Sequence, residues 1–122
     1  MSAAPLLVVS ERTDADGIFV FRIADGDGRL ELLRQTPDIS NPFFISIHPN
    51  GRVLYSITDP GGERLVSALS FNRDSGALEL INQQPTRGDY PCYVEVDPTG
   101  RAVVVANYGG GSVISYPLTD GG

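Results

Sequence analysis

An internal repeat with a period of 48 to 49 residues constrains the fold of this chain more than any other feature of its sequence. The segment His48-Pro-Asn-Gly-Arg52 returns 49 positions later as Asp97-Pro-Thr-Gly-Arg101. The segment Asp27-Gly-Arg-Leu-Glu-Leu32 returns 48 positions later as Ser75-Gly-Ala-Leu-Glu-Leu80. Self-similarity at a fixed period of this length is typical of proteins that repeat one supersecondary unit. The chain is therefore expected to be an array of similar units.

Each unit is predicted to hold four short strands, named A to D in chain order. Pro-Asn-Gly and Pro-Thr-Gly separate A from B, because proline suits the second position of a type I turn and glycine closes it. No stretch keeps a 3.6-residue apolar period, so we expect almost no helix. The apolar run at 103–106 predicts a strand that is buried on both faces. The predicted ranges are A at 43–47 and 92–96, B at 53–58 and 102–107, C at 18–23, 65–71 and 112–118, and D at 30–35 and 78–84.

Four antiparallel strands repeated every 40 to 50 residues indicate an all-β fold, the β-propeller. Residues 6–10 fall at the B position, so a first blade at about 6–36 has no A strand. A second blade at about 42–84 is complete, and a third at 91–122 has A, B and C. Since a ring takes about four to eight blades, residues 1–122 are interpreted as the N-terminal part of one larger propeller domain. Alone, this part is expected to be inactive.

Charge and composition exclude several classes of function. The net charge is −6 and no cluster of basic residues occurs, which argues against a nucleic acid partner. The N-terminal apolar run is too short for a signal peptide or a membrane span. A single cysteine and no zinc-type spacing predict no metal, and we expect no other cofactor. The default expectation is a cytoplasmic protein without a membrane partner.

Several segments resemble the seven-bladed propeller lactonases of the 6-phosphogluconolactonase type, which include relatives of the carboxymuconate cyclases. The resemblance covers nearly the whole chain. Its most specific part is Val105-Ala-Asn-Tyr-Gly-Gly-Gly-Ser-Val113, preceded by Pro91-Cys92 and Asp97-Pro-Thr-Gly-Arg101; weaker support comes from Asn41-Pro-Phe-Phe-Ile45 and Asn82-Gln-Gln-Pro85.

The resemblance implies about two and a half of seven blades and a lactone hydrolase. The expected reaction converts 6-phosphogluconolactone, a small sugar lactone, to 6-phosphogluconate. The alternatives are a lactone-forming or lactone-opening cyclase for carboxymuconate-like acids, and a propeller that serves as a binding scaffold without catalysis.

Strand direction predicts which connections face a substrate. The B–C connections (11–16, 59–64, 108–111) and the D–A connections (36–41, 84–90) lie on one face of the disc, opposite the A–B and C–D turns. Loops held by a rigid scaffold commonly form binding sites. We therefore predict substrate contacts from Asn41, Asn107 and Tyr108, and a bidentate phosphate contact from Arg87. No catalytic residue is assigned, because the resemblance implies that those lie in later blades.

Three other features have structural explanations. His48 is the one histidine, but it follows strand A on the face opposite the predicted site, so we interpret it as scaffold. Cys92 has no histidine partner for nucleophilic chemistry and is expected to pack as part of a pocket wall. The three glycines at 109–111 lead into a strand rather than a helix, which favours a tight turn over a phosphate loop.

Overall fold

The computed structural model describes residues 5–11, 17–120 and 122, and within them it contains ten strands and one short 3₁₀ turn. The strands form three antiparallel sheets in which neighbours along the chain are neighbours in space. This confirms the prediction of an all-β chain. Among the described residues, no helix has the length and apolar character needed to cross a membrane.

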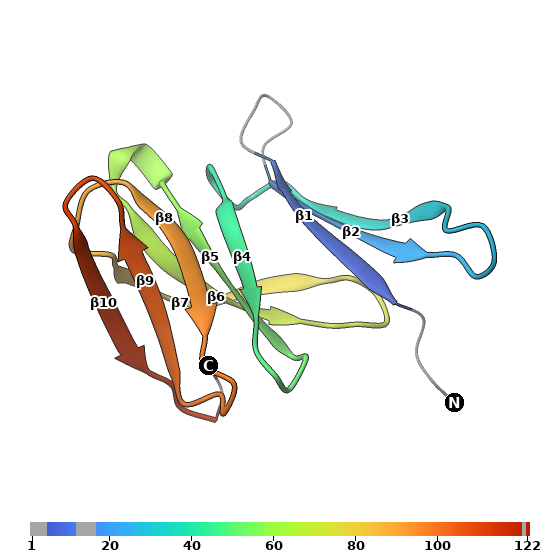
Figure 1. Ribbon diagram of the computed structural model, residues 1–122. Coiled ribbons are helices and arrows are strands. Elements are labelled where there is room, and N and C mark those ends of the chain that lie inside the picture. The colour runs from blue at the N-terminus through green and yellow to red at the C-terminus, as the bar shows by residue number, and fades with distance from the viewer. Residues whose placement is uncertain (1–4, 12–16, 121) are drawn as a thin grey trace.

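The first and third sheets have three strands and the second has four (Figure 1). The order is β1-β2-β3, then β4-β5-β6-β7, then β10-β9-β8. The predicted strands agree with these bounds to within one residue at each end. The strands are β1 (Leu6–Glu11), β2 (Gly17–Ile23), β3 (Leu30–Thr36), β4 (Phe43–Ile47), β5 (Val53–Thr58), β6 (Leu65–Phe71), β7 (Leu78–Pro85), β8 (Pro91–Val96), β9 (Ala102–Asn107) and β10 (Ser112–Pro117).

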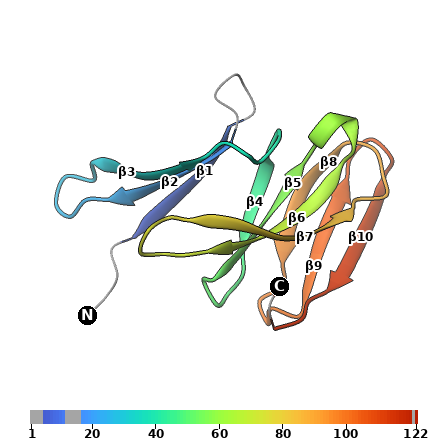
Figure 2. The ribbon, with the colours of Figure 1, turned by 180° about the vertical axis from the view of Figure 1, so that it is seen from behind.

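The sheets stand side by side in sequence order, as the opposite views in Figures 1 and 2 show. Strand β4 contacts β1 on one side and β8 on the other, so A strands lie along the inner line of the array. The hydroxyl of Ser46 on β4 accepts the backbone N–H of Val96 on β8 at 3.1 Å. Phe44 and Tyr93, on the same two strands, have ring centroids 4.6 Å apart.

Two hydrophobic cores fill the spaces between the sheets. Strand β5 supplies both, because alternate residues of a strand point to opposite faces. Val53, Tyr55 and Ile57 join the core shared with the third sheet, whereas Leu54 joins the core shared with the first. All six residues of β5 are buried. The second sheet is therefore the layer on which the other two pack.

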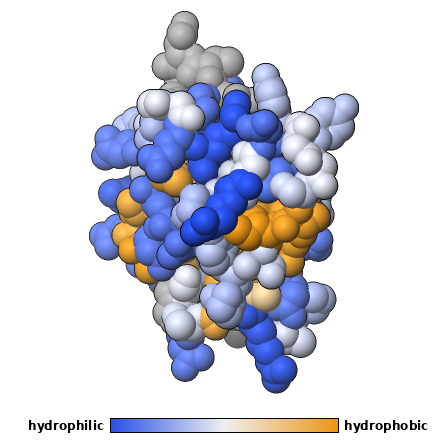
Figure 3. All heavy atoms as spheres, turned by 90° about the vertical axis from the view of Figure 1, so that its left-hand side faces the viewer, coloured by the Kyte–Doolittle hydropathy of each residue, from blue (hydrophilic) through white to orange (hydrophobic). Residues whose placement is uncertain are grey.

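Burial alternates along strand β9. The run at 103–106 was expected to be buried between neighbouring sheets, and the described residues supply a neighbouring sheet on one of its two sides. Val103 and Val105 are buried against the second sheet, while Val104 and Ala106 are half-buried. Among the described residues, no further sheet covers the outer side of the third sheet. Figure 3, which looks at the molecule from that side, shows hydrophobic patches among polar side chains.

Candidate functional site

Two opposite faces of the array carry different kinds of connection, the turn face and the loop face. The turn face holds the A–B and C–D turns, at residues 24–29, 48–52, 72–77 and 97–101. The loop face holds the connections at 37–42, 59–64, 86–90 and 108–111. In Figure 1 the 3₁₀ turn Pro60–Gly62 and the β9–β10 connection lie along the upper edge, opposite the A–B turns. The predicted connection at 12–16 lies outside the described residues.

His48 belongs to the turn face, as predicted. The backbone N–H of Asn50 donates to His48 Nδ1 at 3.0 Å, so the ring proton sits on Nε2 and is directed at the carbonyl oxygen of Gly100, 3.1 Å away. The ring thus links the A–B turn of the second sheet to that of the third. Both nitrogens have backbone partners, which supports a structural role for this histidine.

The loop face contains a pocket of about 170 Å³ between the second and third sheets. Its walls combine apolar side chains from the strand ends with polar and charged groups from all four loop-face connections. The lining residues are Asn41, Phe43, Ile57, Asp59, Arg64, Tyr90, Pro91, Cys92 and Tyr108. This convergence of polar groups on a small concave site is typical of ligand-binding pockets, and we name it the loop-face pocket.

Arg64 is the cationic residue of the loop-face pocket. It lies just before β6, is half-buried, and places its guanidinium carbon 4.9 Å from the centre of the Tyr90 ring. A cation over an aromatic face at this distance is attracted by the ring quadrupole. The ion pairs among the described residues involve Arg22 and Arg29 with Glu31, and Arg64 takes part in none of them.

Asp59 adds a carboxylate to the same pocket. Its backbone N–H donates to the carbonyl oxygen of Ser40 at 3.1 Å, which anchors the start of the 59–64 connection beside the 37–42 connection. Its Oδ1 atom is buried and has no hydrogen-bond partner among the described residues. Buried polar atoms are nearly always paired, so this orphaned oxygen is unusual; the Asp59 carboxylate as a whole lines the pocket and is a candidate acceptor for a hydroxyl of a ligand.

Asn107 holds two loop-face connections together rather than lining the pocket. Its side chain is 2% exposed, and its Nδ2 donates to the carbonyl oxygen of Thr86 at 2.9 Å and to the hydroxyl of Ser112 at 3.3 Å. A Cβ on Gly88 would lie 2.6 Å from Asn107 Cγ, so only glycine allows this approach. Beside it, the N–H of Tyr108 donates to the carbonyl oxygen of Tyr90 at 2.8 Å.

The structure thus separates the four predicted substrate-binding residues. Asn41 and Tyr108 line the loop-face pocket, and Tyr108 is 82% exposed. Asn107 is buried beneath the site, and Arg87 is an exposed loop residue that is not part of the pocket lining. Cys92 lies in the pocket wall, as expected. The glycines at 109–111 form a turn in which the N–H of Gly111 donates to the carbonyl oxygen of Asn107 at 3.0 Å.

Sequence reasoning assigned no role to Arg64 or Tyr90. Strand topology had already placed both residues on the loop face. Nothing in the sequence distinguished Arg64 from Arg87, because the stacking of Arg64 on Tyr90 joins two connections that are distant along the chain. Among the described residues, no group of three potential metal ligands gathers anywhere.

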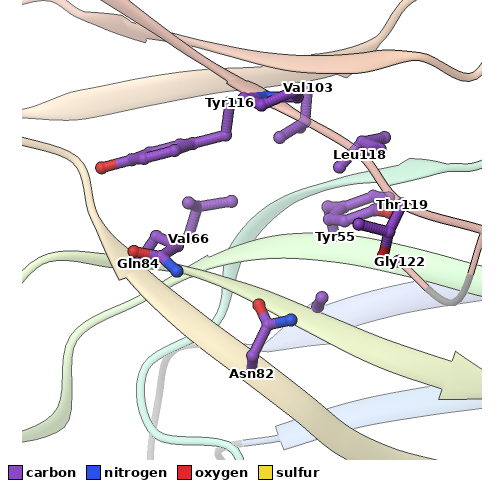
Figure 4. A pocket seen from close by; sticks show the side chains of 11 residues that line it. Tyr55, Val66, Asn82, Gln84, Val103, Tyr116, Leu118, Thr119 and Gly122 are labelled. Carbon is purple, nitrogen blue, oxygen red and sulfur yellow. The ribbon is translucent and has the colours of Figure 1, made fainter.

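A second pocket, of about 310 Å³, lies between the second and third sheets away from the loop face (Figure 4). Asn82 and Gln84 on β7 face Tyr116 and Leu118 across it. The hydroxyl of Tyr55 is buried there without a hydrogen-bond partner in the described chain, and this burial raises the pKa of Tyr55. Although larger, this pocket contains no charged side chain and lies beside β10, whose outer edge has no strand partner among the described residues. The loop-face pocket is therefore the stronger candidate site.

Comparison with known proteins gives one consistent result. The family model described as "Lactonase, 7-bladed beta-propeller" matches residues 6–122. The chain is 31% identical over 108 residues to the 6-phosphogluconolactonase of Bacillus subtilis, covering 88% of this chain and 31% of that protein. It is 29% identical to the 6-phosphogluconolactonase of Formosa agariphila, with 93% and 33% covered.

Solved structures agree with the sequence relatives. A putative 6-phosphogluconolactonase from Bacteroides fragilis superposes with a TM-score of 0.84 at 30% identity, covering 96% of this chain and 33% of that one. The periplasmic gluconolactonase of Pseudomonas aeruginosa gives a TM-score of 0.81 at 29% identity, with 96% and 35% covered. The chain spans about a third of the length of these relatives.

Proposed function

This chain belongs to the seven-bladed β-propeller lactonases, and on that premise we propose that it forms consecutive blades of an enzyme that hydrolyses 6-phosphogluconolactone to 6-phosphogluconate. The observation that carries the proposal is the agreement between the family match over residues 6–122 and relatives named 6-phosphogluconolactonase at about 30% identity. In this proposal the sheets at about 6–36, 42–84 and 91–122 are blades of one domain.

The proposed reaction defines what the complete site must supply. Water adds to the lactone carbonyl carbon, and the carbonyl oxygen takes the negative charge of the tetrahedral intermediate. Collapse of that intermediate breaks the bond to the ring oxygen, which takes a proton and leaves as a hydroxyl, and the new carboxylic acid ionises. Catalysis requires a base or a positioned water, and donors aimed at the oxyanion. We assign neither role to a residue of this chain.

The loop-face pocket is proposed as this chain's share of the substrate site. It lies on the face that strand topology predicts for ligand binding, and it collects groups from four connections that are separated in sequence. The substrate is a small sugar lactone, as part of carbohydrate metabolism. We propose a cytoplasmic enzyme; because one structural relative is a periplasmic gluconolactonase, cell fractionation is the appropriate check.

Lactone turnover tests the proposed function. The polypeptide carrying this chain together with the blades that complete the ring in its relatives should release protons from fresh 6-phosphogluconolactone faster than spontaneous hydrolysis does. The 122-residue chain alone should not, since a site at the ring centre needs the remaining blades and unpaired strand edges favour association. Heat-denatured protein is the control.

Other outcomes of this assay identify the rival functions. Turnover of an unphosphorylated diacid lactone, with none of the sugar phosphate, would favour a cyclase. Absence of turnover with every lactone would overturn the enzyme proposal and favour a binding scaffold.

A further inference from the structure

Arg64 is a half-buried cation that forms no ion pair within the described part of a protein that has many carboxylates. The sequence contains 9 basic and 15 acidic residues, and all the basic ones are arginines. Arg22 and Arg29 follow the ordinary pattern and pair with Glu31 on the surface. Arg64 instead lies over an aromatic ring at the loop-face pocket. Its charge is therefore available to a ligand that enters there.

The contact with Tyr90 positions the Arg64 guanidinium group at the pocket, where it can bind an oxyanion. Stacking uses the flat face of the guanidinium group, whereas its N–H donors lie in the plane and point outward from its edges. The backbone of Tyr90 is held in place, because its carbonyl oxygen accepts the N–H of Tyr108 at 2.8 Å, although the residue itself is 67% exposed. Arg64 takes part in no ion pair among the described residues, so its N–H donors can serve the bidentate contact that phosphate and carboxylate groups accept.

The other pocket groups restrict the ligand further. Asp59 would repel an anion placed beside it, but its carboxylate, which lines the pocket, would accept a hydrogen bond from a hydroxyl. Asn41 and Tyr108 add polar groups to the same wall. At about 170 Å³ the pocket is smaller than the roughly 300–1,000 Å³ typical of whole-ligand sites. It therefore suits one anionic group and the hydroxyl-bearing carbons next to it.

We propose that Arg64, held by Tyr90, binds the phosphate group of the sugar substrate, with Asp59 accepting a neighbouring hydroxyl. This inference rests on the proposed function for the identity of the ligand. The sequence favoured Arg87 for the phosphate contact; this proposal assigns that contact to Arg64, which lines the pocket. The residues that carry the proposed contacts all lie in this chain, so the subsite is tested in the 122-residue chain, after far-ultraviolet circular dichroism has verified that this chain is folded.

Cys92 provides a direct probe, because it is the one cysteine of the sequence and lines the same pocket. The experiment measures the rate at which iodoacetamide alkylates Cys92 in the 122-residue chain at constant ionic strength. 6-Phosphogluconate is expected to slow alkylation in a saturable manner. Gluconate, which lacks the phosphate, is expected to protect about tenfold more weakly, as loss of a charge-assisted contact predicts. Inorganic phosphate tests whether the anion alone suffices.

Substitutions assign the effect to a residue. Arg64→Gln should weaken protection by 6-phosphogluconate about tenfold or more, and Arg64→Lys should weaken it nearly as much because lysine lacks the planar fork. The fold should survive both changes, since the contacts that Arg64 makes to Thr86 use the backbone carbonyl oxygen. Circular dichroism verifies this. Arg101→Gln, on the turn face, removes the same charge and should leave protection unchanged.

Three results would overturn the inference. Undiminished protection in Arg64→Gln would exclude Arg64, and an equal loss in Arg101→Gln would mean that net charge alone is responsible. Loss in Arg87→Gln in place of Arg64→Gln would restore the sequence prediction. Protection by 6-phosphogluconate without lactone turnover by the complete ring would refute the proposed function while leaving the subsite intact. Turnover without Arg64-dependent protection would refute the subsite alone.

Discussion

The turn face and the loop face differ in where they hold backbone strain. Among the described residues, every positive φ on the turn face belongs to a glycine, such as Gly51 and Gly100. On the loop face and at the start of β4, four residues other than glycine adopt positive φ: Asn41, Phe44, Arg87 and Tyr90. Such conformations cost of order 1–3 kcal/mol each and gather at functional sites.

Buried polar atoms without a hydrogen-bond partner in the described part of the chain lie away from the turn face. They are Oδ1 of Asp59, Oδ1 of Asn107 at the end of β9, and the hydroxyl of Tyr55 in the second pocket. The carboxylate of Asp97, on the turn face, accepts the backbone N–H groups of Thr99, Arg101 and Ala102 and the Thr99 hydroxyl. The Asp97 turn is thus closed by its own hydrogen bonds, whereas the loop-face connection at 59–64 contains a carboxylate oxygen that has no partner among the described residues.

The largest predicted effect is on the turn face. Gly100→Ala should lower the free energy of unfolding by about 2–4 kcal/mol, because residue 100 has φ +74° and a Cβ there would lie 2.6 Å from His48 Cε1. Urea denaturation measures this. Gly111→Ala is the matched control on the loop face, with φ +65° and no atom within 4 Å of the added carbon. It should lose only about 1–2 kcal/mol; equal losses would mean that the contact with His48 adds nothing.

A smaller effect tests whether Asn107 is scaffold or ligand contact. Asn107→Ala should lower the free energy of unfolding by about 1–2 kcal/mol, because it leaves the carbonyl oxygen of Thr86 without its side-chain donor. It should also speed hydrogen exchange at the Tyr108 amide, which bonds to Tyr90. Tyr108→Ala, at an exposed position, should change stability by less than about 0.5 kcal/mol. Unchanged stability in Asn107→Ala would contradict the scaffold role.

The smallest predicted effect is the pH dependence of stability that Asp97 contributes. Asp97 begins the A–B turn of the third sheet, where the second sheet has His48. The hydrogen bond from the Thr99 hydroxyl, followed by those from the backbone N–H groups of Ala102, Arg101 and Thr99, lowers the pKa of Asp97 to about 2. Since this pKa is below that of the unfolded chain, the stabilisation is complete above the ordinary value and is lost as pH falls through about 2. The carboxylate is exposed, so the change in stability is small.

Nuclear magnetic resonance titration of the Asp97 carboxyl checks this value, and Asp97→Asn should remove its share of the acid dependence. A midpoint near 3.8, the ordinary value for aspartate, would show that the turn does not hold the carboxylate as described.

The strands were predictable because their signals are local. Alternating apolar residues and Pro-Asn-Gly or Pro-Thr-Gly turns gave the bounds of β4, β5, β6 and β9 without error. Strand alternation then predicted which connections share a face, and the structure places Asn41 and Tyr108, from two of these connections, in the lining of the loop-face pocket. These conclusions need only the period of a strand and the direction of its neighbours.

Tertiary structure decided the rest, because the deciding contacts join residues that are remote in sequence. Burial of the run at 103–106 depended on which faces of the third sheet have a neighbouring sheet, which composition does not encode. The hydrogen bond from Asn107 to the carbonyl oxygen of Thr86 gives Asn107 its structural role. The contact of Arg64 with the Tyr90 ring places the guanidinium group at the pocket. The repeat by itself predicted the propeller architecture of this chain, and the resemblance of segments such as 105–113 predicted its family. The assignment of side chains to scaffold or pocket required the packing of one sheet against the next.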